Sequence, residues 1–119
     1  MDRSLEAALS VPVSEVKAEL FKALGHPARV RVLEVLSEGE HSVSDMQPLV
    51  GIESSHLSQQ LGILRRAGLV TTRKDGASVI YSLADPTLAE LLAVAKRLLI
   101  SSLDRTEGLL ADLRSAAGR

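Results

Sequence analysis

The chain contains no cysteine and very few aromatic residues. Without cysteine it has no disulfide, no zinc–thiolate site and no cysteine nucleophile. Phe21 and Tyr81 are its only residues of the Phe, Tyr and Trp types, so the core must consist of leucine, valine, isoleucine and alanine. An aliphatic core of this kind suits helices packed on helices. Because the chain has 119 residues, we expect one small, mainly α-helical domain.

Long apolar runs are also missing from the sequence. No N-terminal stretch resembles a signal peptide, and no run approaches the length needed to span a bilayer. We therefore expect a cytoplasmic protein that has no membrane partner.

The chain has no strong net charge, but its charges are unevenly distributed. The formal net charge is −1, which argues against a general nucleic-acid binder. Residues 34–53 contain five acidic residues and no lysine or arginine, whereas residues 54–83 contain four basic residues and one acidic residue. A locally positive segment in a neutral protein is typical of a sequence-selective DNA binder, because it limits indiscriminate attraction to phosphate.

Apolar periodicity predicts a run of helices after a flexible arm at residues 1–13. Pro12 separates the arm from the first helix, Gly25 ends that helix and Pro27 opens the second. Ser42 caps the third helix, in which Pro48 indicates either a kink or a displaced start. The four helices are expected over residues 14–24, 27–37, 42–50 and 54–67.

Beyond Leu69 the periodicity changes from helical to alternating. Two short alternating runs flank Asp75 and Gly76, which both tolerate the positive φ of a type I′ turn. The pattern predicts a β-hairpin with basic residues near its tip.

One long helix is expected over residues 86–115, with Asp85 as its N-cap and Pro86 at its first position. Its apolar face is too wide and too long for so small a domain to cover. We therefore expect the first and last helices to form a homodimer interface. The candidate interface residues are Leu20, Leu91, Leu92, Leu98, Leu99 and Leu103.

A short helix, a glycine-containing turn at residues 51–53 and a second helix are the parts of a helix-turn-helix. The hairpin after them adds a wing. The predicted fold is therefore a winged helix-turn-helix in the order α-α-α-α-β-β-α. It occupies residues 14–115 and ends in a dimerisation helix, residues 86–115.

The second helix of this motif offers polar residues opposite its leucine stripe. Gln59 is the first candidate for reading a base, and Ser55 and Ser58 are expected to share base and phosphate contacts. Ser54 either joins them or serves only as the N-cap. Gln60 lies towards the flank, where it contacts phosphate or only solvent.

The wing carries Arg73 and Lys74, which suit contact with phosphate or the minor groove. The alternative is that they are solvated hairpin charges. Arg65 and Arg66 lie late on the helix and could pair with acidic neighbours instead of DNA.

Three segments resemble the ArsR/SmtB family of winged-helix repressors. They run from Phe21 to Leu33 (FKALGHPARVRVL), from Ser58 to Val70, and from Asp75 to Leu83. The resemblance covers about residues 15–100. It implies a dimer held by the terminal helices and repression of an inverted-repeat operator that an inducer relieves.

The metal sites of that family are not matched. Where members that sense soft metals carry Cys-x-Cys-Asp, this chain has Ser42-Val43-Ser44-Asp45, and its last helix has no histidine. The resemblance is therefore to a branch of the family that lacks the metal-binding cysteines. We expect an unidentified non-metal signal to release the repressor from its operator. His26 suits a structural role at a helix start. Binding of a metal by His41 with Asp45, or by His56, stays open.

Two alternatives remain beside a DNA-binding repressor. One is a metal-responsive repressor with a non-thiolate site, and the other is a protein-interaction module on the same scaffold. An enzyme is excluded, because no glycine-rich phosphate loop or carboxylate–histidine cluster is present. We expect no catalytic residues, no metal and no cofactor.

Overall fold

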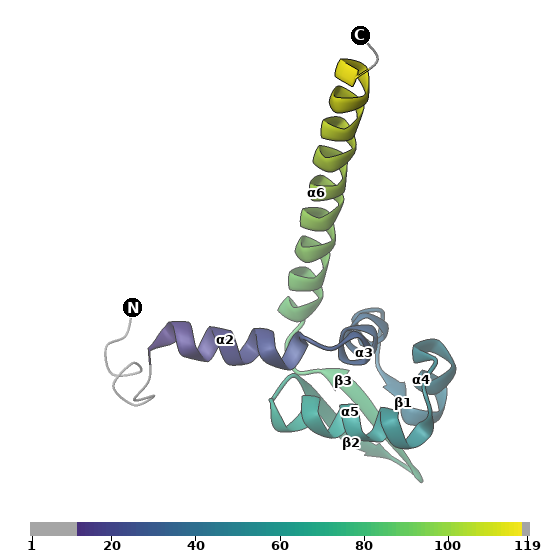
Figure 1. Ribbon diagram of the computed structural model, residues 1–119. Coiled ribbons are helices and arrows are strands. Elements are labelled where there is room, and N and C mark those ends of the chain that lie inside the picture. Colours follow the sequence, from purple (N-terminus) through teal and green to yellow (C-terminus); the bar gives the residue numbers. More distant parts are fainter. Residues whose placement is uncertain (1–11, 118–119) are drawn as a thin grey trace. The chain divides into compact units, whose positions relative to one another are not determined.

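The computed structural model describes residues 12–117. They fall into two compact units, one ending at Pro86 and one beginning at Thr87. In the described part of the chain, the first unit holds the helices α2 to α5 and the strands β1 to β3, and the second unit is the helix α6 (Figure 1). A mainly α-helical chain with a small sheet confirms the predicted fold class.

The four predicted helices of the first unit all form. They are α2 (Val13–Leu24), α3 (Pro27–Ser37), α4 (Val43–Val50) and α5 (Ser54–Arg66). Most of the predicted N-terminal arm, residues 1–11, lies outside the described residues. The N-cap of α2 is Pro12, so this helix begins one residue before the predicted start at position 14.

Side chains and glycine fix the ends of α3 and α4. His26 is the N-cap of α3, where its Nδ1 accepts a hydrogen bond from the Ala28 amide at 3.1 Å. Ser42 caps α4 as predicted, because its hydroxyl accepts from the Asp45 amide at 3.2 Å. Pro48 lies inside α4, so the start of this helix is not displaced. Gly51, with φ at +77°, ends it.

The sheet has one more strand than the sequence predicts. β2 (Val70–Asp75) and β3 (Ser78–Leu83) form the expected antiparallel hairpin. β1 (His41–Ser42) pairs with the other edge of β3, which gives the order β1-β3-β2. A strand of two residues is too short to show a period in the sequence.

The hairpin turn lies one residue later than predicted. Asp75 pairs with Ser78, so Gly76 and Ala77 form the two-residue loop. The prediction that Asp75 and Gly76 are the two central residues is therefore wrong. Gly76 has φ at +62°, and glycine adopts this conformation without steric cost.

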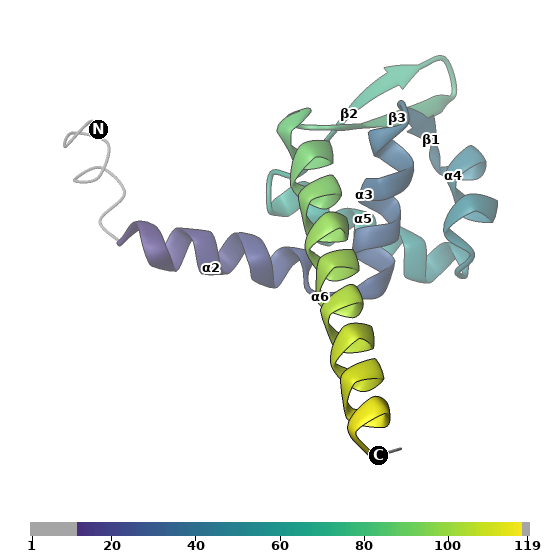
Figure 2. The same cartoon turned by 90° about the horizontal axis from the view of Figure 1, so that it is seen from above.

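The core of the first unit is aliphatic, as predicted. α3 lies among α4, α5 and the sheet (Figure 2), and Val32, Leu33 and Leu36 are buried along it. On α4, Met46 and Val50 are fully buried and form the inner face of the helix. The predicted stripe on α5 is confirmed, because Leu57, Leu61 and Leu64 are each at most 1% exposed.

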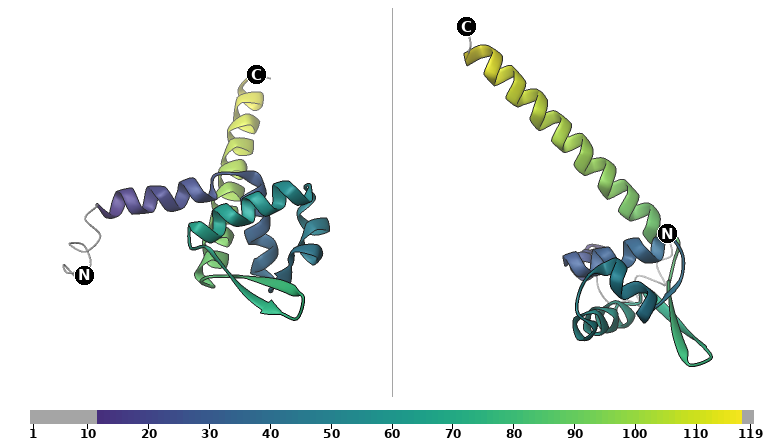
Figure 3. Two further views of the ribbon diagram at one scale, coloured as in Figure 1. Left: turned by 90° about the horizontal axis from the view of Figure 1, so that it is seen from below. Right: turned by 90° about the vertical axis from the view of Figure 1, so that its right-hand side faces the viewer.

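The second unit is one unbroken helix, α6 (Thr87–Ala117), close to the predicted 86–115 (Figure 3). With 31 residues it is about 46 Å long. Its exposed large apolar residues are 44–64% exposed, and they are Val94, Leu98, Leu99, Ile100, Leu103, Leu109, Leu110 and Leu113. No helix within residues 12–117 combines the length and the apolar character that crossing a membrane requires.

Candidate nucleic-acid interface

The turn between α4 and α5 is built to fix the angle between these two helices. Gly51 adopts the left-handed conformation that ends α4, and its amide donates to the Gln47 carbonyl at 2.9 Å. Across the turn, the Ser54 hydroxyl donates to Oε1 of Gln47 at 3.2 Å. Glu53 is the N-cap of α5. Ser54 is thus the first helical residue, and its expected alternative role as the N-cap is wrong.

α5 presents a polar face opposite its buried leucines. Ser54, Ser55, Ser58 and Gln59 are all exposed, and no residue of the helix is acidic. Hydroxyl and amide groups are able to donate to and accept from base edges and phosphates. The residues that the sequence singled out as base readers are therefore accessible to solvent, and α5 contacts strand β2 of the hairpin.

Gln60 does not belong to this surface. It is only 5% exposed, and its Oε1 accepts a hydrogen bond from Nη1 of Arg29 at 3.0 Å. The prediction that Gln60 contacts phosphate or solvent on the flank of the helix is wrong, because the side chain is turned inwards. Its partner lies 31 positions earlier in the chain, so the pattern of α5 alone could not predict this contact.

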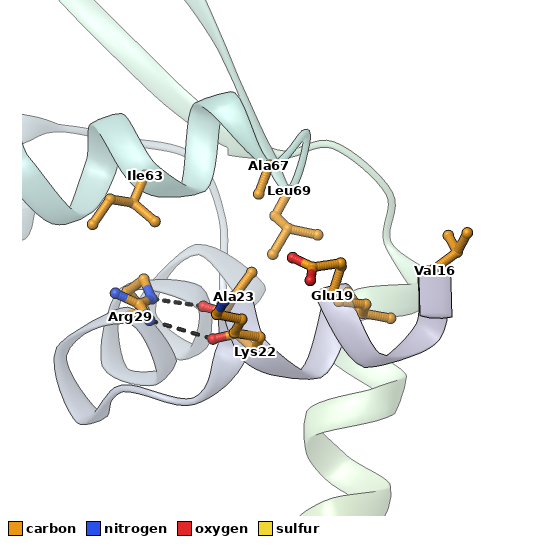
Figure 4. A pocket seen from close by; sticks show the side chains of 9 residues that line it. Val16, Glu19, Lys22, Ala23, Arg29, Ile63, Ala67 and Leu69 are labelled. Carbon is orange, nitrogen blue, oxygen red and sulfur yellow. Dashed lines mark hydrogen bonds between the residues drawn. The ribbon is translucent and has the colours of Figure 1, made fainter. Parts of the chain in front are cut away.

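Arg29 connects α2, α3 and α5 through one guanidinium group. From α3 it donates to Gln60 on α5, and its Nε donates to the carbonyl of Ala23 at 2.6 Å. Its Nη2 reaches the carbonyl of Lys22 at 3.4 Å (Figure 4). Carbonyls in the last turn of a helix have no partner within the helix. Arg29 therefore caps α2 and at the same time holds α5.

A largely apolar groove of about 600 Å³ adjoins this arginine. Side chains of α2 form one wall, and Ile63, Ala67 and Leu69 face them across the gap (Figure 4). Leu20, a predicted interface residue, lines it as well. One residue of the predicted dimer interface therefore lies in the lining of this groove.

The hairpin wing holds Arg73 in an ion pair. Its Nη2 lies 2.5 Å from Oε1 of Glu40, and its Nη1 lies 3.9 Å from the carboxylate of Asp75. The Ser82 hydroxyl donates to the other oxygen of Glu40 at 3.2 Å. Sequence reasoning missed Glu40, because the 33 residues that separate it from Arg73 leave no local signal.

Electrostatic effects at the wing favour the charged forms of both partners. The hydrogen bond from Arg73, together with its positive charge and the bond from Ser82, holds the pKa of the Glu40 carboxyl below its ordinary value. The hydrogen bond and charge of Glu40 raise the pKa of Arg73. By contrast, Lys74 is exposed and has no ion pair within residues 12–117.

Two further cations lie at the end of α5. Arg65 and Arg66 are both exposed. Neither takes part in an ion pair within residues 12–117, so the alternative that they pair with acidic neighbours is not observed in this part of the chain. Both charges remain available at the polar surface.

The three histidines do not converge. His26 has the structural role that the sequence suggested, as the cap of α3. Its ring meets that of His56 edge to face, with the ring centroids 5.9 Å apart. The third histidine, His41, has its Nδ1 2.8 Å from the carbonyl oxygen of Gly39. Within the described chain, no three His, Cys, Asp or Glu side chains are placed to share a metal ion.

A helix-turn-helix whose second helix exposes a polar face, followed by a hairpin wing, defines the winged helix-turn-helix class of DNA-binding proteins. The comparisons with known proteins agree with this class. The model of the bacterial regulatory proteins of the arsR family matches residues 26–72.

Individual proteins match over more of the chain. The HTH-type transcriptional regulator Rv0081 of Mycobacterium tuberculosis is 53% identical over 107 residues, which cover 89% of this chain and 94% of that protein. Its crystal structure matches with a TM-score of 0.74 and 54% identity, over 81% of this chain and 97% of that one. The biofilm growth-associated repressor of Agrobacterium fabrum is 39% identical, over 71% of this chain and 75% of that protein.

A homodimeric winged helix-turn-helix domain, Mb0332 from Mycobacterium bovis, is 26% identical with a TM-score of 0.70, over 88% of this chain and 93% of that one. The chain belongs to the arsR family of bacterial regulatory proteins. It is a DNA-binding transcriptional repressor and not an enzyme.

Proposed function

We propose that this repressor binds an inverted-repeat operator as a homodimer and inserts α5 of each protomer into the major groove. One observation carries the proposal: α5 exposes Ser55, Ser58 and Gln59 opposite a fully buried leucine stripe. In such motifs the N-terminal residues of the recognition helix contact base edges. Gln59 reads a base, because its amide is able to pair with adenine N6 and N7. Ser54 contributes a phosphate contact at the start of the helix.

The homodimer is supported by the apolar residues that single protomers leave exposed. On α2 these include Val16 and Phe21, which is 58% exposed. On α6 they include Leu98, Leu99 and Leu103, each more than 60% exposed. Burial of such surface contributes roughly 25 cal/mol per Å². The similarity to a homodimeric domain supports the same assembly. Leu20, Leu91 and Leu92 complete the proposed interface.

The wing contributes phosphate contacts. Lys74 is the stronger candidate, since it has no ion-pair partner in the described part of the chain. Arg73 joins it only by exchanging Glu40 and Asp75 for a phosphate. Phosphate contacts position a protein on DNA without reading sequence.

Release from the operator results from a change in the distribution of dimer states. Two recognition helices must lie about 34 Å apart to enter successive major grooves. An inducer that binds a differently spaced dimer more tightly shifts the population away from DNA. A non-metal signal fits a chain without cysteine. We place the repressor in the cytoplasm, where its operator lies.

The proposal is tested by fluorescence anisotropy with the DNA upstream of the protein's own gene, in the presence of excess random DNA. We expect binding that survives the competitor. The bound fraction should follow the concentration of dimer rather than that of monomer. Added Zn²⁺, Ni²⁺ and Co²⁺ are expected to leave the affinity unchanged, and a loss of binding would favour the metal-responsive alternative. Equal binding to random DNA, or none, would favour a protein-interaction module.

A further inference from the structure

Gly62 and Arg66 lie in line with the proposed base readers on α5. With 3.6 residues per turn, Ser55, Gln59, Gly62 and Arg66 fall within about 60° of one another around the helix axis. This arc is opposite the buried leucines at positions 57, 61 and 64. The middle of the proposed DNA-facing surface is thus a glycine, and its C-terminal end is an arginine.

The side chain of Arg66 lies over Gly62. A Cβ atom placed on Gly62 would be 3.3 Å from Nη1 of Arg66, and 3.9 Å from its Cζ and Nη2. Side chains in a helix lean towards its N-terminus, which is the direction that Arg66 takes. The guanidinium is thereby carried about one turn, roughly 5 Å, towards Ser55 and Gln59.

The backbone does not explain why position 62 is glycine. Its φ is not among the positive values found at other glycines of the described chain. In a helix interior, glycine is less favourable than every residue except proline. The group nearest to position 62 is the guanidinium of Arg66, which a methyl group there would displace by a few tenths of an ångström.

The charge of Arg66 is available to a ligand. The side chain is exposed and has no acidic partner between residues 12 and 117, and α5 contains no acidic residue. A guanidinium offers five N–H donors in one plane, which match a phosphate with two parallel hydrogen bonds. The chemistry of this position therefore suits a phosphodiester.

The length of the helix shows which part of DNA is within reach. The major groove is about 12 Å wide, and the rise from Ser55 to Gly62 is about 10 Å. When the first turns of α5 read bases, a group lying over Gly62 reaches the edge of the groove, where the strand backbone runs.

We propose that Arg66 binds an operator backbone phosphate, and that Gly62 favours this contact because it lets the guanidinium lie close against the DNA-facing side of α5. The inference rests on the proposed function, in which α5 enters the major groove. It assigns a DNA contact to a residue for which the sequence, as for its neighbour Arg65, left pairing with acidic neighbours open.

The test measures affinity against salt concentration for the wild type, Arg66→Ala and Arg65→Ala. Arg66→Ala is expected to weaken operator and random DNA alike, by about tenfold, and to lower the salt slope by about 1. Arg65→Ala is the comparison variant, since it removes the same charge about 100° further around the helix, on the side of Ser58 rather than of Ser55 and Gln59. An unchanged slope for Arg66→Ala, or an equal loss for Arg65→Ala, overturns the assignment.

Gly62→Ala tests the role of the glycine. Alanine favours the helix, so the melting temperature is expected to rise while DNA affinity falls about threefold to tenfold. In the Arg66→Ala background the same change is expected to cost no further affinity, because coupled residues are not additive. The same loss in both backgrounds would mean that the new methyl group meets DNA directly, and would overturn the role given to Gly62.

Failure of the proposed function and failure of the roles given to Arg66 and Gly62 would give different results. If the wild type binds no upstream DNA, the proposed function fails. If the wild type binds, and if Arg66→Ala and Gly62→Ala melt cooperatively but do not change DNA binding as expected, only the assignment of Arg66 and Gly62 fails.

Discussion

At the scale of single residues, the proposed DNA contacts fall into two groups: some residues are proposed to read sequence and others only to attract phosphate. Gln59 is exposed on the outward arc of α5, where an amide is able to pair with a base. Lys74 is exposed on the wing, where a charge meets phosphate. The two residues are expected to respond differently to the same substitution.

Gln59→Ala should relax base preference, weakening operator binding by about tenfold, or roughly 1.4 kcal/mol, while leaving random DNA unaffected. Lys74→Ala should weaken both kinds of DNA alike and lower the salt slope by about 1. Competition between operator and random duplexes at several salt concentrations measures both effects. An equal loss for both DNAs on changing Gln59 would contradict its role as a base reader.

The Glu40–Arg73 ion pair gives the wing a dependence on pH. The pKa of Glu40 is lowered from 4.5 in the folded protein, so the pair is fully formed above that value and is lost as pH falls through the lowered pKa. We expect the NMR signals of Arg73 and the β2–β3 amides to shift below about pH 4.5. In Glu40→Gln this transition should disappear.

Glu40→Gln should also release Arg73 for DNA. Binding to random DNA is expected to tighten a few-fold, with a steeper salt slope, because a cation has lost its internal partner. Glu38→Gln is the matched control, since it removes the same charge from an exposed residue of the same loop. Equal tightening in the two variants would show that only net charge matters.

At the level of elements, α5 is held by more than its leucines. The guanidinium of Arg29 spans from the last carbonyls of α2 to the buried amide of Gln60. α2 carries part of the proposed dimer interface, and α5 carries the proposed base readers. One hydrogen-bonded group therefore connects the helix proposed to pair protomers with the helix proposed to read DNA.

Gln60→Leu should destabilise the fold by about 1–2 kcal/mol, because it leaves a partly buried guanidinium donor without its acceptor. Gln60→Glu keeps the acceptor oxygen and should cost less. Urea unfolding followed by circular dichroism measures the difference. A leucine variant as stable as the wild type would mean that the Arg29–Gln60 bond contributes nothing to holding α5.

At the level of the whole molecule, stability and DNA binding are expected to depend on pairing. α6 exposes leucines along much of its length, and a partner helix is the proposed cover. Dimers held in this way melt at temperatures that rise with protein concentration.

Leu99→Glu should dissociate the dimer and abolish operator binding, because it places an unpaired charge in an apolar interface. Ser101→Glu adds the same charge on the opposite side of the helix, about 160° away, and should leave the dimer intact. Sedimentation velocity distinguishes the two outcomes. A dimeric Leu99→Glu variant would contradict the proposed role of α6.

The helices, the hairpin and the class of protein could be predicted from local patterns, because they depend on periodicity and on capping by residues such as Ser42 and Gly51. It also predicted that Leu57, Leu61 and Leu64 lie inwards, so the opposite arc of α5 could be derived from spacing alone.

Which polar groups stay exposed depends on contacts between residues that are far apart in the chain. Gln60 turned out to be buried because Arg29 comes to meet it, and Arg73 proved to be paired because Glu40 lies beside the wing. The short strand β1 exists because β3 offers it an edge. Each of these contacts joins residues 31 or more positions apart, and such pairing leaves no mark on the local pattern from which a sequence is interpreted.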